Sequence, residues 1–275
     1  LMSQNFTTNT DSYNVAVGYT AGREITTGVN NTLLGALAGD ALTTGSNNQA
    51  IGRDALGADT LGSQSIAIGR LALGSQNFTT ATDVYNVAIG SQSGFAITTG
   101  VRNTLIGALA GDALTDADLN VAVGFQSLSA DTLGSRSVAI GPFTLQAQNF
   151  TTATDSYNVA VGADAGLLVT TGVQNTLIGG LAGDALTTGV QNVAVGYNAL
   201  STEDGHGGNV AVGVSALLTL NAGADGYNTA VGHVAGTAVT TGIKNTIMGA
   251  FAGDALTDAD NNVAIGYQAL TTEDI

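Results

Sequence analysis

A six-residue phrase ending in glycine recurs fifteen times and constrains the fold more than any other feature. The first copies read YNVAVG, NNTLLG and NNQAIG, and the copies end at Gly18, Gly35, Gly52, Gly69, Gly90, Gly107, Gly124, Gly141, Gly162, Gly179, Gly196, Gly213, Gly232, Gly249 and Gly266. Most neighbouring copies keep the constant period seen from Gly18 to Gly35, and every fourth interval is longer, as from Gly69 to Gly90. A fixed short period is the signature of a solenoid, with one rung per repeat. Seventeen residues at about 3.3 Å each make one short circuit of β-structure.

Four rungs make a longer repeat, which runs from Gly18 to Gly90 and again from Gly90 to Gly162. The sequence therefore predicts an all-β parallel β-roll, or β-solenoid, of about 15 rungs over residues 1–275. Its super-repeats cover about 5–76, 77–148, 149–218 and 219–275. Because the opening LMSQNFTT falls inside a repeat, we interpret the chain as an excerpt of a longer fibre.

The three residues before each closing glycine form three columns when the rungs are aligned. The last column, directly before the glycine, begins Val17, Leu34 and Ile51 and is always large and apolar, so we expect it to face the core. The middle column begins Ala16 and Leu33, is never polar, and should point to the opposite face of the strand. A strand that is apolar on both faces is buried on both. We therefore expect another chain to cover the middle column.

Other aligned positions have structural explanations. Glycine closes each strand because it adopts positive φ without steric cost. The residue three positions beyond it is small, as at Ala21 and Ala38, which permits close approach of neighbours. The residue four positions before the glycine is Asn in thirteen rungs and Ser in two. Stacked Asn side chains can form amide ladders along a solenoid.

The pattern [N/S]-V-A-[V/I]-G-x-x-[A/S], as in SIAIGRLA from Ser65 and NVAIGSQS from Asn86, resembles the head repeat of YadA-type trimeric autotransporter adhesins. It also resembles related repeats of bacteriophage tail-fibre shafts, and the resemblance extends from Asn14 to Leu270. The resemblance implies a left-handed parallel β-roll, three chains around one axis (a homotrimer), and a role in surface attachment. The rungs of this chain are longer than the typical family repeat, and the family's neck, stalk and membrane anchor are missing from this sequence.

Composition narrows the range of partners. A formal net charge of −15 with six Lys and Arg argues against a nucleic-acid partner, which requires clustered cations. No apolar run approaches the roughly 20 residues that cross a bilayer, so we expect no membrane insertion within this segment. Low basicity and abundant glycine fit an extracellular module at a cell surface or on a virion.

The sequence offers little for chemistry, and we expect no catalysis, no cofactor and no metal site. Neither His206 nor His233 recurs in other copies. Carboxylate pairs occur in turns, at Asp116 with Asp118, at Asp258 with Asp260, and at Glu203 with Asp204. Such pairs leave a virion-associated glycan depolymerase as one alternative, although turn formation is the simpler explanation. Threonine pairs such as Thr43–Thr44 leave an ice-binding solenoid as the other, although no continuous threonine grid exists.

Every fourth rung is extended, and these rungs are the predicted recognition surface. The long copies carry a Phe and all four carry a Tyr (Tyr13, Tyr85, Tyr157 and Tyr227). Loop insertions in a solenoid gather on one side and often form its working surface. The candidate contacts for a host-surface glycan or protein receptor are Phe6, Phe78, Phe150, Thr79, Thr80, Thr151 and Thr152. Alternatively, the aromatic residues join adjacent chains or cover the open side of the roll.

Overall fold

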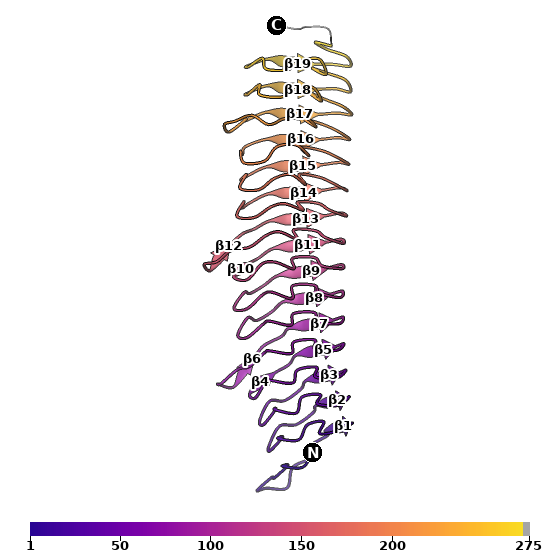
Figure 1. Cartoon of the computed structure of the whole chain (residues 1–275), viewed down its shortest axis with the longest axis vertical. Coiled ribbons are helices and arrows are strands. Elements are labelled where there is room, and N and C mark those ends of the chain that lie inside the picture. Colours follow the sequence, from indigo (N-terminus) through magenta and orange to yellow (C-terminus); the bar gives the residue numbers. More distant parts are fainter. Residues whose placement is uncertain (272–275) are drawn as a thin grey trace. The chain divides into compact units, whose positions relative to one another are not determined.

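The computed structural model describes residues 1–271 and shows an all-β parallel β-solenoid of about 15 rungs, with one main strand for each copy of the sequence phrase (Figure 1). Residues 1–271 contain no helix, and so no helix that could span a membrane. The strands are β1 (Val15–Val17), β2 (Thr32–Leu34), β3 (Gln49–Ile51), β4 (Gly62–Ser63), β5 (Ile66–Ile68), β6 (Thr82–Asp83), β7 (Val87–Ile89), β8 (Thr104–Ile106), β9 (Val121–Val123), β10 (Gly134–Ser135), β11 (Val138–Ile140), β12 (Thr154–Asp155), β13 (Val159–Val161), β14 (Thr176–Ile178), β15 (Val193–Val195), β16 (Val210–Val212), β17 (Thr229–Val231), β18 (Thr246–Met248) and β19 (Val263–Ile265).

The chain divides into two compact units. The first comprises residues 1–136 with 151–154, and the second comprises 137–150 and the described residues from 155 onward. In the first unit the parallel order is β1-β2-β3-β5-β7-β8-β9, and in the second it is β11-β13-β14-β15-β16-β17-β18-β19.

Strand pairing keeps the sequence columns in register. Val17 pairs with Leu34 across an ordinary interval, and Ile68 pairs with Ile89 across an extended one. The additional residues of that extended rung include β6, which pairs in parallel with β4 of the preceding rung at the left edge of the first unit in Figure 1. An extension therefore enlarges a loop without displacing the main strand.

The expectation about which strand face is inward was wrong. The middle column lines the core of the single chain, with Leu33, Leu105 and Leu177 at 0% exposure. The last column points outward, and Leu34 and Ile106 are 47% and 37% exposed. The interior is narrow because turn residues such as Ala38 also fill it, so it holds mainly Ala in each strand. The large aliphatic residues of the last column therefore lie outside.

Complementary volumes fill this narrow interior. Where the middle column carries Leu33, the facing turn positions are Gly22 and Gly39, and a Cβ at either would lie within 2.8 Å of a Leu33 methyl group. Where that column carries Ala50, the turn position is Leu56, which is fully buried. Large and small residues therefore alternate across the core, as close packing requires.

The closing glycines behave as the sequence predicted. Gly18 has φ +138°, and a Cβ there would clash with the carbonyl group of Gly35 in the next rung. The position needs glycine both for its backbone conformation and for the close approach of the next rung. Non-glycine residues also adopt positive φ in the turns, as at Asn30 (59°) and Leu37 (62°).

The asparagine column holds successive rungs together, as predicted, although its hydrogen bonds go chiefly to the backbone. Oδ1 of Asn31 accepts from the amide N of Asn48 at 2.9 Å, and Nδ2 of Asn31 donates to the Gly45 carbonyl at 2.9 Å. A direct side-chain bond occurs between Asn103 Nδ2 and Asn86 Oδ1 at 3.3 Å. These asparagines are structural residues, buried within the fold.

Candidate functional site

The extended rungs separate the predicted contact residues into two groups. Phe78 and Phe150 are each only 6% exposed, and Phe6 is half-buried. The four threonines Thr79, Thr80, Thr151 and Thr152 are exposed. The phenylalanines therefore pack within this chain and anchor their loops. Of the predicted contact residues, the threonines are the ones exposed to a ligand. Ligand binding by any of these residues stays a prediction.

A buried carboxylate that the sequence analysis missed holds the first complete extension in place. Oδ1 of Asp59 accepts from the backbone amides of Gly62 at 3.0 Å and Phe78 at 3.1 Å. Its Oδ2 accepts from Gln76 Nε2 at 2.6 Å. Burial is the largest influence and raises the pKa of Asp59, while these hydrogen bonds act to lower it. Asp59 therefore fixes both the backbone and the buried Phe of the extended loop.

Gln76 joins this carboxylate to the asparagine column. Besides Asp59, its Nε2 donates to Ser65 Oγ at 3.1 Å, and its Oε1 accepts from Asn86 Nδ2 at 2.9 Å. Ser65 is one of the two positions where the column lacks asparagine. Gln76 thus provides, from inside the rung, the side-chain amide that an asparagine would provide at position 65.

Comparing the rungs position by position could have revealed these buried polar residues. The position seven residues after the closing glycine carries Ile25, then Leu42, then Asp59 and then Gln76, and each is fully buried. The next four rungs repeat this order, with Ile97, Leu114, Asp131 and Gln148, and the third super-repeat has Val169, Leu186, Glu203 and Leu220. An apolar column that turns acidic every fourth rung predicts a buried carboxylate at each extension.

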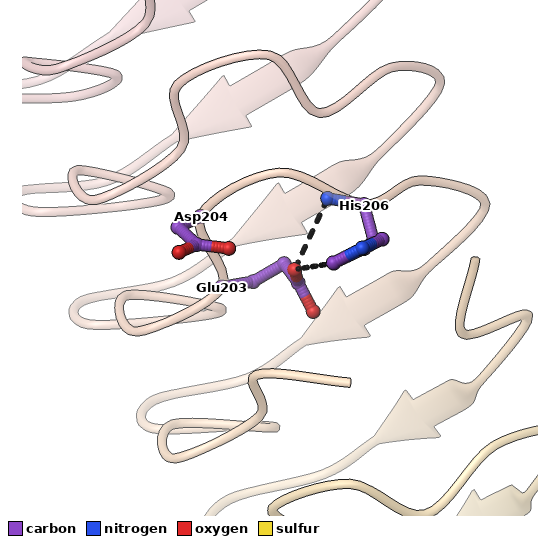
Figure 2. A group of neighbouring side chains, drawn as sticks. All are labelled: Glu203, Asp204 and His206. Atoms are coloured by element: carbon purple, nitrogen blue, oxygen red, sulfur yellow. Dashed lines mark hydrogen bonds and ion pairs between the residues drawn. The ribbon is translucent and has the colours of Figure 1, made fainter. Parts of the chain in front are cut away.

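At the third, shortened extension the buried acid is Glu203. Its Oε1 accepts from the backbone amide of His206 at 3.1 Å and lies 3.2 Å from His206 Nδ1, as Figure 2 shows. Its Oε2 accepts from the Ala222 amide at 3.2 Å. Glu203, Asp204 and His206 each offer one atom that could bind a metal ion, and these three atoms lie within 4.8 Å of one another. Because Glu203 already accepts hydrogen bonds through both oxygens, its arrangement is that of a turn clamp.

The carboxylate pairs identified in the sequence act within turns. Asp118 Oδ1 accepts from the Val101 amide at 2.7 Å, and Asp260 Oδ1 accepts from the Ile243 amide at 2.7 Å. Asp116 Oδ1 accepts from the Thr99 hydroxyl at 2.7 Å. Each bond joins one rung to its neighbour, which supports the interpretation of these acids as turn residues.

A second series of acids occurs once in each super-repeat, at Asp40, Asp112, Asp184 and Asp254. Asp40 lies 3.6 Å from an Arg23 guanidinium nitrogen. Burial raises the pKa of Asp112 and of Asp184, and in each of these the buried Oδ1 accepts no hydrogen bond from the described residues. The described residues form no enclosed pocket beside these or any other side chains.

No protein-family model, no curated protein and no solved structure matches this chain.

Proposed function

We propose that this chain is a segment of a homotrimeric extracellular fibre, a trimeric adhesin head or a phage tail-fibre shaft, that mediates surface attachment without catalysis. The observation that carries the proposal is the outward face of the main strands. In both units the last column presents large aliphatic residues to solvent, among them Leu34, Ile89, Ile140, Ile178 and Met248 at 37–47% exposure. Contiguous exposed apolar surface of this kind usually marks a contact with another protein.

Charge favours a second copy of the chain as the partner. Four columns face outward around the strands, namely the first and last strand columns, the residue after the closing glycine, and the residue five positions before it. None of the 21 acidic residues stands in these columns. Five of the six cations do, at Arg53, Arg70, Arg102, Arg136 and Lys244.

This distribution removes the main obstacle to self-association. Two chains of formal net charge −15 repel each other wherever carboxylates meet, and repulsion grows as water is excluded. A face without acids avoids that cost while burying aliphatic side chains at about 25 cal/mol per Å². Three copies around one axis follow from the resemblance to YadA-type heads and tail-fibre shafts, whose chains assemble in this way.

Sedimentation-equilibrium centrifugation over a range of concentrations tests the assembly. We expect the mass of three chains of 27.2 kDa, and a monomer at every concentration would contradict the proposal. Attachment is tested separately, by measuring binding of the assembled protein to host-cell surfaces and to a glycan array. A trimer that bound neither would refute the adhesive role and leave the assembly intact.

A further inference from the structure

The extended rungs contain a motif that attachment does not explain. Asn5, Asn77 and Asn149 each begin the sequence Asn-Phe-Thr, which fits the Asn-x-Ser/Thr acceptor of N-linked glycosylation. All three are exposed and stand eight residues after a closing glycine or its equivalent, in a column that otherwise consists mainly of threonine. A chance match is common for so short a motif, so the geometry of the loop decides its value.

The loop exposes both residues of the motif that carry functional groups. Asn77 and Thr79 are exposed, whereas Phe78 between them is 6% exposed. The amide of the motif and its hydroxyl therefore both belong to solvent-exposed residues. The Asn77 amide N donates to the Thr98 carbonyl at 2.9 Å, and the Phe78 amide N donates to Asp59 at 3.1 Å. The acceptor is therefore held in place by the next rung on one side and by a buried carboxylate on the other.

The reacting nitrogen of Asn77 is available. Its Oδ1 accepts from the Thr60 hydroxyl at 3.1 Å, while its Nδ2 donates to no group among the described residues. A fourth motif, Asn30-Asn31-Thr32, differs on this point, because Asn30 Nδ2 donates to Asn47 Oδ1 at 3.2 Å and Thr32 lies within β2. In the extended rung, by contrast, all three motif residues Asn77, Phe78 and Thr79 lie outside the strands.

We propose that Asn5, Asn77 and Asn149 are acceptors for N-linked glycosylation by a transferase that uses a nucleotide-activated hexose. In the reaction Nδ2 bonds to the anomeric carbon, the bond from that carbon to the diphosphate oxygen breaks, and the nucleoside diphosphate leaves. The lost amide proton passes to a base of the transferase. The sugars lie outside the four outward columns, so modification leaves the proposed chain–chain contact uncovered.

The chain contains its own control for the hydroxyl requirement. Asn221 occupies the same column in the shortened extension, is exposed, and donates its backbone amide to the Thr240 carbonyl at 2.7 Å. It is followed by Ala222 and Gly223 and so lacks the threonine. A transferase that required only an exposed asparagine in this geometry would modify Asn221 as well.

The test incubates the folded chain with an N-glycosyltransferase that recognises Asn-x-Ser/Thr and with UDP-glucose, followed by intact mass and peptide mapping. We expect up to three added hexoses, at Asn5, Asn77 and Asn149, with none at Asn30 or Asn221. Thr79→Ala should abolish addition at Asn77 alone, and Thr79→Ser should retain it, with unchanged thermal melting in both. Addition to these asparagines in the urea-unfolded chain but not in the folded chain would overturn the proposal.

Discussion

Adjacent residues Leu105 and Ile106 allow the assignment of the strand faces to be tested at one site. Leu105 belongs to the middle column and has no exposed surface, whereas Ile106 belongs to the last column and is 37% exposed. We predict that Leu105→Ala destabilises the single chain strongly, and that Ile106→Ala affects it weakly. Ile106→Asp should leave the fold intact and prevent association.

The magnitudes follow from the surroundings of each side chain. A Cβ added at Gly94 would lie 2.8 Å from one methyl group of Leu105, and a Cβ added at Gly111 would lie 2.8 Å from the other. Glycine backbone therefore lines the Leu105 side chain on both sides. Backbone that is fixed in two rungs cannot collapse into a cavity, and the loss should lie at the upper end of the ~2–5 kcal/mol range for Leu→Ala. Ile106 loses less buried area, and we expect about 1 kcal/mol for its truncation in an isolated chain.

Urea unfolding followed by circular dichroism measures the free energy of unfolding, and sedimentation equilibrium measures the assembly state. Because dissociation and unfolding can be coupled, the stability of the alanine variants is compared at matched low concentrations. If Ile106→Asp unfolded the chain while Leu105→Ala preserved its stability, the last column would be the core and our assignment of the faces would be refuted.

Three further predictions concern backbone and buried polar groups. Gly179→Ala should lower the free energy of unfolding by about 3 kcal/mol or more, because φ is +136° and the added Cβ would lie 2.5 Å from a carbonyl oxygen. Gly180→Ala should be nearly neutral, since the atom nearest to its added Cβ is 3.5 Å away. Urea unfolding curves compare the two variants. Because burial raises the folded-state pKa of Asp59, the wild type should gain stability relative to Asp59→Asn as the pH falls from about 7 towards about 4, measured by urea unfolding at each pH. Ser65→Asn and Gln76→Leu should each destabilise the chain, and together should cost less than their sum in the same assay.

Much of the fold follows from periodicity alone. The constant spacing predicts the rung, and the closing glycines predict positive φ, which Gly18 shows at +138°. The choice of inward face could not be obtained in this way, because both Leu33 and Leu34 are apolar and alternation alone does not distinguish them. The deciding quantity is the interior volume. That volume depends on how far turn residues such as Ala38 and Leu56 enter the core, which only the folded rung reveals.

The sequence shows that the extended rungs differ from the others, but it does not show the structural role of their aromatic residues. Phe78 appeared available for contact because it stands in a loop, and loops are usually at the surface. Its burial depends on Asp59, which stands in the preceding rung and holds the Phe78 amide. The adjacent carboxylate pairs, such as Asp116 with Asp118, are the pattern typical of catalysis or metal binding. An isolated acid such as Asp59 in an otherwise apolar column gives a different signal, which requires the columns to be compared rung by rung.

The natural sequence already contains the double replacement that we predict to be compensating. Ser65 and Gln76 correspond, two super-repeats later, to Asn209 and Leu220. Leu220 is fully buried, and Asn209 Nδ2 contacts Asn192 Oδ1 at 3.3 Å, so an asparagine in the column occurs together with an apolar residue inside the rung. The amide is needed once in each rung, either in the column or from the interior.

Each single replacement disturbs this balance in its own way. Ser65→Asn places a larger amide where Gln76 Nε2 lies 3.1 Å from the serine oxygen, so two amides compete for one space. Gln76→Leu removes the donor to Asp59 Oδ2 and leaves that buried oxygen without its 2.6 Å partner. The double variant relieves the crowding, and we expect a coupling energy of about 1–2 kcal/mol in a double-mutant cycle. Additivity to within roughly 0.3 kcal/mol would mean that the two positions do not share one amide site. In that case the pairing of Asn209 with Leu220 would carry no structural meaning.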